Sequence, residues 1–148
     1  MTAIGFYHLT RSSLEEALGP LLERTLDGGA RAVVWCPDRD RVSTLDAALW
    51  RTPEPSWIPH GTAADGHPTL QPIWLTAEAD APNGAGFLFL VGGRELVDPE
   101  RFRRAFDLFD GNDPAAVEAA RRRWSRYKAE GHELAYWRQE PKRWVRAG

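Results

Sequence analysis

The sequence predicts an α/β fold, and two observations carry that prediction. Short apolar runs that suit buried strands alternate along the chain with segments whose apolar residues recur at helical spacing. This alternation is typical of a mostly parallel central sheet with helices flanking its faces. The 148 residues, 43% of them hydrophobic and 27% charged, are enough for one domain with its own core. We therefore expect a single three-layer domain over 1–148, with 138–148 either ordered or a loose tail.

The first half is expected to run strand, helix, strand, helix. Two serines stand three residues ahead of two glutamates, which gives overlapping capping boxes at the start of the first helix, and a glycine pair ends it. The expected positions are a strand over 4–9, a helix between Ser13 and Gly28, a strand over 31–35 and a helix ending near Trp50.

The second half is expected to supply further strands on either side of a polar loop and two helices. The run FLFLV at 87–91 suits a strand that is buried on both faces. Pro72 interrupts a second strand, over 70–76, and favours an edge position or a bulge for it. A final strand is expected over 133–138.

Two Asp-Pro pairs predict the helices of this half, because aspartate is a good N-cap and proline suits the first helical position. One helix should start at Pro99, and the last should run from Pro114 to about Glu130. The residues expected to pack the first of these helices inward are Phe102, Ala105, Phe106 and Phe109.

Composition excludes several classes of protein. The longest apolar run is far too short to span a membrane, and the first residues do not resemble a signal peptide, so we expect a cytoplasmic protein without a membrane partner. The single cysteine, Cys36, excludes an intrachain disulfide and a zinc knuckle, and it is interpreted as a core residue.

The net charge of −2 hides an uneven distribution. Residues 1–120 carry 10 Lys and Arg against 18 Asp and Glu, whereas residues 121–148 carry 9 against 3. A basic end on an acidic body favours an anionic partner for that end, either nucleic acid or an acidic peptide. An uneven surface that is merely solvated remains the alternative.

No motif for catalysis or cofactor binding is present. The first strand leads into HLTRSS, which has no phosphate-binding glycines, and Gly92-Gly93 lack the third glycine of a dinucleotide site. The four histidines are isolated in sequence, and His8 is the one candidate for a base. We therefore expect no enzyme, cofactor or metal. A small nucleotide-binding enzyme is the alternative, and the absent phosphate loop disfavours it.

The last helix is the most informative element. Val117, Ala120, Trp124 and Tyr127 share its core face, and Arg121 and Lys128 lie seven residues apart on one line beside Trp124. A guanidinium and an ammonium on this line could hold a carboxylate, with an apolar side chain lodged against the indole ring. This arrangement predicts a site for a short acidic peptide that ends in an apolar residue.

Three other arginines of this helix, Arg122, Arg123 and Arg126, are expected to point more fully to solvent. A direct interaction of 121–126 with single-stranded nucleic acid is therefore a further alternative.

A second candidate surface follows the helix that ends near Trp50. Prolines at 53, 55 and 59 stiffen the next segment, which carries Trp57, Pro59 and His60. Neither tryptophan is needed to complete an apolar stripe, so both are interpreted as anchors for a partner, with burial in the core as the alternative.

Four segments in order resemble the chi subunit family of bacterial DNA polymerase III. They are FYHL at 6–9, LDAALW at 45–50, W-x-P-H at 57–60 and W-x-x-Y-K-x-x-G at 124–131. The resemblance implies a Rossmann-like domain without catalytic activity that serves DNA replication as an accessory of the clamp loader.

The same resemblance implies two binding surfaces. The acidic, Pro-Phe-terminated tail of single-stranded DNA-binding protein would bind Arg121, Trp124 and Lys128, and the psi subunit or a repair helicase would bind the surface of Trp50 and Trp57. DNA would be contacted only indirectly. At Ser125 this sequence departs from members that carry another basic residue, which predicts weaker tail binding.

Overall fold

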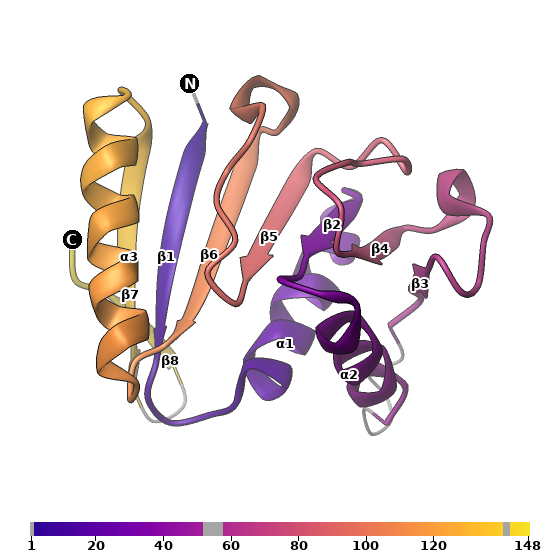
Figure 1. Ribbon diagram of the computed structural model, residues 1–148, viewed down its shortest axis with the longest axis horizontal. Helices are drawn as coiled ribbons and strands as arrows, with labels where there is room; N and C mark the ends of the chain where they lie inside the picture. Colours follow the sequence, from indigo (N-terminus) through magenta and orange to yellow (C-terminus); the bar gives the residue numbers. More distant parts are fainter. Residues whose placement is uncertain (1, 52–57, 141–142) are drawn as a thin grey trace.

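An eight-stranded sheet forms the centre of the computed structural model (Figure 1), which describes residues 2–51, 58–140 and 143–148. The strand order is β3-β4-β2-β5-β6-β1-β7-β8, and within the described residues every neighbouring pair is parallel except β7 with β8. The predicted α/β class with a mostly parallel sheet is therefore confirmed. The strands are β1 (Ala3–Leu9), β2 (Ala32–Trp35), β3 (Gly61–Thr62), β4 (Ile73–Thr76), β5 (Phe87–Val91), β6 (Arg104–Asp110), β7 (Glu133–Glu140) and β8 (Arg143–Arg146).

Each of the three α-helices in the described residues begins at a side-chain cap, and the caps of α1 and α3 are those that the sequence predicts. Ser13 makes both bonds of a capping box for α1 (Leu14–Asp27), and Asp38 accepts a bond from the N–H of Arg41 to start α2 (Arg39–Trp50). Asp113 caps α3 (Pro114–Ala129), whose first residue is the expected proline. These side chains satisfy N–H groups that a helix leaves unpaired at its start.

The core lies on both faces of the sheet. One cluster holds the inner faces of α1 and α2, including Leu18, Leu22 and Leu45, while the other holds the inner face of α3, including Tyr127. Alternate residues of each strand point to opposite faces, so the central strands contribute to both clusters. The helices thus form a layer on either side of the sheet.

The prediction of a helix that starts at Pro99 is wrong. Pro99–Arg101 form a single 3₁₀ turn (η2), and β6 follows it. Asp98 has a φ of 51° and makes no side-chain cap bond. The apolar spacing in 102–109 fits a helix as well as a strand that is buried on both faces. Pairing with β5 and β1 decides for the strand.

The segment over 70–76 also differs from its prediction. Leu70 ends a short 3₁₀ turn, η1 (Pro68–Leu70), and β4 begins only after Pro72, so the proline leaves the ladder of β4 intact. β4 lies between β2 and the two-residue β3 and is not an edge strand.

The C-terminal segment 143–148 contains the last strand. β8 pairs antiparallel with β7, and the ring of Trp144 packs edge-on against Tyr7 with centroids 4.9 Å apart. β7 includes the expected strand over 133–138 and runs two residues further. The hairpin of β7 and β8 therefore extends the sheet beyond α3.

Candidate functional site

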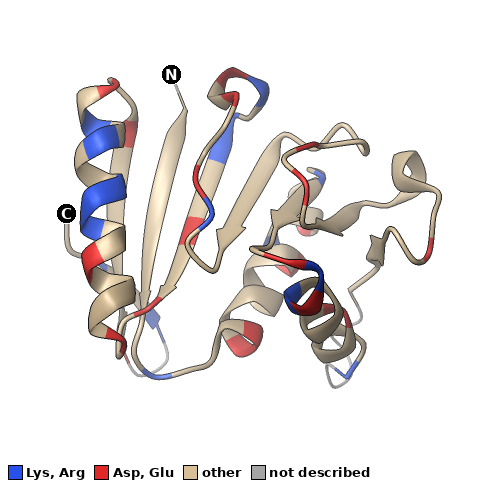
Figure 2. Cartoon of the chain, in the orientation of Figure 1, with Lys and Arg blue, Asp and Glu red and all other residues tan. Residues whose placement is uncertain are grey.

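Basic residues gather along α3, the helix that covers β1 and its neighbours (Figure 2). Ala120 and Tyr127 are buried on its inner face. Trp124 is half-buried, with its ring centroid 5.3 Å from that of Phe6 and 5.9 Å from that of Tyr136. The indole is thus fixed by aromatic neighbours on the sheet, and its remaining surface is available at the side of the helix.

A hollow of about 470 Å³ opens between α3 and the sheet, beside Trp124. We call it the α3 hollow. Its walls are largely aromatic and aliphatic, and the guanidinium-bearing side chain of Arg121 stands among them. The lining residues are Phe109, Val117, Ala120, Arg121, Trp124, Ser125 and Tyr136.

Tyr136, one of the residues that line the α3 hollow, carries a hydroxyl group. This hydroxyl is hydrogen-bonded to Nδ1 of His8, whose Nε2 lies 3.4 Å from the carbonyl oxygen of Gly111. Burial raises the pKa of Tyr136, and the positive charges of Arg121 and Arg138 act against that rise.

The structure brings Arg121 and Trp124 together at this hollow but leaves Lys128 outside its lining. Seven residues of helix separate Arg121 from Lys128, a rise of about 10 Å. Both side chains are exposed, and neither has an acidic partner among the described residues. The exposed Arg122 and Arg126 are instead paired, with Glu118 at 3.6 Å and with Glu95 at 3.0 Å.

The expectation that Arg123 points to solvent is wrong. Its side chain is 5% exposed and binds Asp107 of β6 through two hydrogen bonds, of 2.7 Å from Nε and 2.9 Å from Nη2. Position 123 follows Ala120 by three residues and precedes Tyr127 by four, which places it on the buried face. Burial alone lowers the pKa of Arg123 and raises that of Asp107, but the carboxylate outweighs burial and raises the pKa of Arg123. The two short bonds indicate an ionised pair.

The second candidate surface is only partly described, because Trp57 and its flanking residues 52–56 lie outside the described residues. Trp50 is 53% exposed, and its ring centroid lies 4.7 Å from that of His60. His60 is itself buried, with Nδ1 2.8 Å from the carbonyl oxygen of Ile58 and Nε2 2.9 Å from a carboxylate oxygen of Asp46. Pro59 is half-buried. His60 thus supports Trp50 from beneath.

In nucleotide-binding proteins of this fold class, the loop after the first strand binds phosphate through its backbone N–H groups. In this protein, the backbone N–H groups of that loop are hydrogen-bonded to a side chain instead. The side-chain amide oxygen of Gln139, Oε1, accepts hydrogen bonds from the backbone N–H groups of Thr10 (3.1 Å), Arg11 (2.8 Å) and Ser12 (3.3 Å). Converging N–H groups of this kind are what an anion would need. The occupied loop disfavours the nucleotide-binding alternative.

Sequence reasoning missed several parts of this site, above all Tyr136, Arg138 and Gln139 of β7. The alternation of β7 was the available signal, since residues two apart share one face. Within the described residues, no group of three or more His, Cys, Asp or Glu side chains is placed to hold a metal ion. None of the helices described is long and apolar enough to cross a membrane.

The fold is that of an α/β domain with an apolar hollow at the side of its last helix. The chain belongs to the family described as DNA polymerase III chi subunit, HolC, whose model matches residues 1–135.

Two relatives are chi subunits of this polymerase by name. The probable DNA polymerase III subunit chi of Rickettsia prowazekii (strain Madrid E) is 27% identical over 97 residues, which cover 66% of this chain and 59% of that protein. The DNA polymerase III subunit chi of Escherichia coli (strain K12) is 23% identical over 124 residues, 83% of this chain and 84% of that protein. The predicted family is therefore confirmed, and the names of the family and of both relatives describe subunits of DNA polymerase III.

Proposed function

We propose that this protein links single-stranded DNA-binding protein to the polymerase assembly, and that the α3 hollow binds the acidic C-terminal tail of that partner. The observation that carries the proposal is an apolar hollow beside Trp124 with Arg121, which has no acidic partner among the described residues, in its wall. A terminal aromatic side chain would fill the hollow, and its carboxylate would meet the guanidinium.

The chemistry of the surrounding side chains supports this assignment. Charge-assisted bonds from a guanidinium to a carboxylate are stronger than neutral ones. Burial of an aromatic ring against Trp124 and Tyr136 would add apolar and edge-on aromatic contacts. Lys128 stands about 10 Å further along the helix and would contribute through its charge. The exposed Ser125 in the wall supplies no charge.

Fluorescence anisotropy with a labelled acidic peptide that ends in Pro-Phe tests the proposal. Arg121→Ala should weaken binding about ten-fold or more, since a hydrogen bond to a charged group contributes about 1.5–3 kcal/mol. Arg122→Ala is the matched control, because Arg122 is exposed on the same helix and already paired. Raising the salt concentration should weaken binding, since the charges involved are open to solvent.

A peptide without its terminal phenylalanine should lose most of its affinity. If it binds as well as the complete peptide, and the Arg121 and Arg122 variants behave alike, the α3 hollow is not the tail site.

We further propose that the surface around Trp50 binds the polymerase-side partner, which is the psi subunit or alternatively a repair helicase. The exposed indole, supported by His60, carries this proposal, and Trp57 and Pro59 are proposed to belong to the same surface. The protein would then act in the cytoplasm at the replication fork and contact DNA only through its partners.

A further inference from the structure

The hairpin of β7 and β8 presents charged side chains next to the α3 hollow. Tyr136, Arg138 and Glu140 alternate along β7, so all three lie on the face of the sheet that α3 covers in part. Arg143 of β8 pairs directly with Glu140 in the antiparallel register and therefore shares this face. The wall of the hollow thus continues onto the hairpin as a charged surface.

Glu140 is the one acid among these side chains, and it forms an ion pair with Arg138. Its Oε1 atom lies 3.3 Å from both Nε and Nη2 of Arg138, whose side chain is 56% exposed. Arg11 and Arg143 are exposed and have no acidic partner among the described residues. The backbone of Arg11 is bonded to Gln139, which tethers it beside Arg138 and Glu140.

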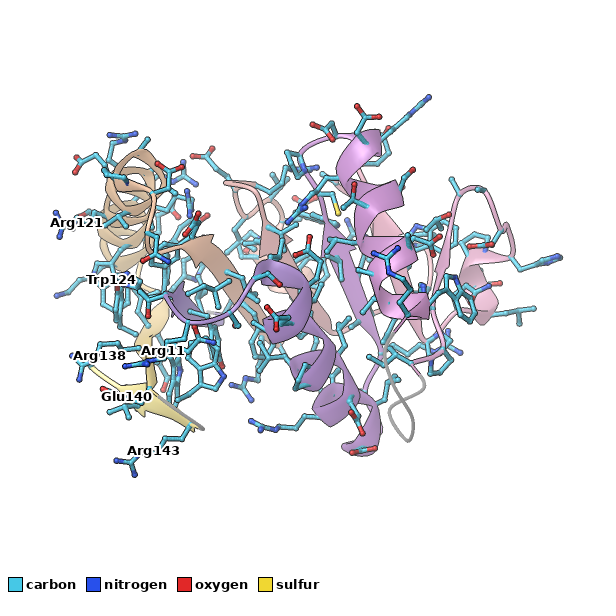
Figure 3. All side chains as sticks on the ribbon, turned by 90° about the horizontal axis from the view of Figure 1, so that it is seen from below. Arg11, Arg121, Trp124, Arg138, Glu140 and Arg143 are labelled. Carbon is cyan, nitrogen blue, oxygen red and sulfur yellow. The ribbon has the colours of Figure 1, made fainter. Side chains whose placement is uncertain are left out.

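These residues lie in succession along one side of the molecule. Figure 3 shows Arg121 and Trp124 on α3, then Arg138 and Arg11, and then Glu140 and Arg143 on the hairpin. Arg121 and Tyr136 both line the hollow, and Arg138 follows Tyr136 by two residues on the same face of β7, so Arg138 stands next to the hollow on its hairpin side. An extended peptide with its last side chain in the hollow can therefore continue over the hairpin.

On the basis of the proposed function, we propose that Arg138 and Arg143 bind the acidic side chains that precede the terminal residue of the tail. Glu140 occupies this place in the free protein and gives it up when the tail binds. The fork of an arginine suits a carboxylate with two parallel bonds, so an incoming acid can replace the one that Glu140 supplies. The tail then runs from the hollow across the hairpin, away from Lys128.

Two labelled peptides with the same Pro-Phe end test this path, one with aspartates before it and one with asparagines. Arg138→Gln should weaken binding of the aspartate peptide about ten-fold and leave the asparagine peptide within two-fold of the unchanged protein. Arg122→Gln removes one charge elsewhere on the same face and should change neither. Glu140→Gln should tighten binding of the aspartate peptide several-fold, whereas Glu118→Gln, its matched control, should not.

The outcomes separate this inference from the proposed function. If Arg121→Ala abolishes binding but Lys128→Gln, rather than Arg138→Gln, removes the preference for aspartate, the tail runs along the helix and the inference is wrong. If the Glu140 and Glu118 variants tighten binding equally, only the overall charge is being sensed and the inference also fails. If Arg138→Gln weakens binding of a single-stranded oligonucleotide but not of the aspartate peptide, the hairpin serves nucleic acid instead. If Arg121→Ala binds both peptides normally, the proposed function itself falls.

Discussion

The ion pair between Arg123 and Asp107 should be a large contributor to the position and stability of α3. Its side chains are 5% and 2% exposed and joined by two bonds of 2.7 and 2.9 Å. Replacing Arg123 by methionine keeps most of the volume but leaves a buried carboxylate without its cation. Breaking a buried pair in this way costs about 3–5 kcal/mol. With a urea dependence of about 1–3 kcal/mol per molar, the unfolding midpoint should fall by roughly 1–5 M.

Urea unfolding, monitored by far-UV circular dichroism, measures this loss of stability. Two further variants serve as controls. Arg126→Ala breaks an exposed pair with Glu95 and should cost less than about 1 kcal/mol. The double variant Arg123→Met with Asp107→Leu removes both charges and should recover much of the stability that the single change loses. If Arg123→Met unfolds at the same urea concentration as Arg126→Ala, the pair does not fix the helix and our account of α3 is wrong.

Three other outcomes are expected. Ser125→Lys places a positive charge in the wall of the α3 hollow and should tighten binding of the acidic peptide, which a salt-dependent gain in the anisotropy assay would show. Trp50→Ala should leave the urea midpoint nearly unchanged, because the side chain is 53% exposed, and should abolish co-purification of the polymerase-side partner; a large loss of stability would assign Trp50 to the core. Burial raises the pKa of the Cys36 thiol from its ordinary 9.0 to about 12, so the native protein should resist thiol reagents at neutral pH. The neutral thiol then contributes stability that is complete below pH 9 and lost as the pH rises towards 12, which urea midpoints across that range measure.

The local signals in the sequence located most elements and failed where two periodicities overlap. Capping residues at 13 and 113 predicted the starts of α1 and α3, because a cap acts within a few residues, whereas the same signal at Asp98 predicted a helix where a 3₁₀ turn and a strand stand. The apolar residues of 102–109 satisfy both a helical and a strand pattern, and only pairing with β1 and β5 resolves the choice. The local sequence pattern does not show which strands pair with each other.

The candidate site shows the same limit at the level of single side chains. The helical wheel placed Arg121 and Trp124 correctly beside each other, since both belong to one helix. It misplaced Arg123, because a charged residue next to the apolar stripe is expected to be exposed unless an acidic partner within the core is known. That partner, Asp107, comes from β6, whose residues were expected in or near a helix. The β7 side of the hollow was missed for the related reason that it is joined to α3 only by tertiary packing.

The positions of the two candidate surfaces in the sheet support a linking role. The α3 hollow lies at the β7 end of the sheet, whereas α2, which carries Trp50, contacts β3 and β4 at the other end (Figure 1). Five strand spacings of about 4.8 Å separate β4 from β7, which is roughly 24 Å. This separation leaves room for a short peptide at the hollow and a second protein at the Trp50 surface at the same time. The central strands of the sheet are buried on both faces and form a stiff support, so each partner would meet a surface that the other leaves unchanged.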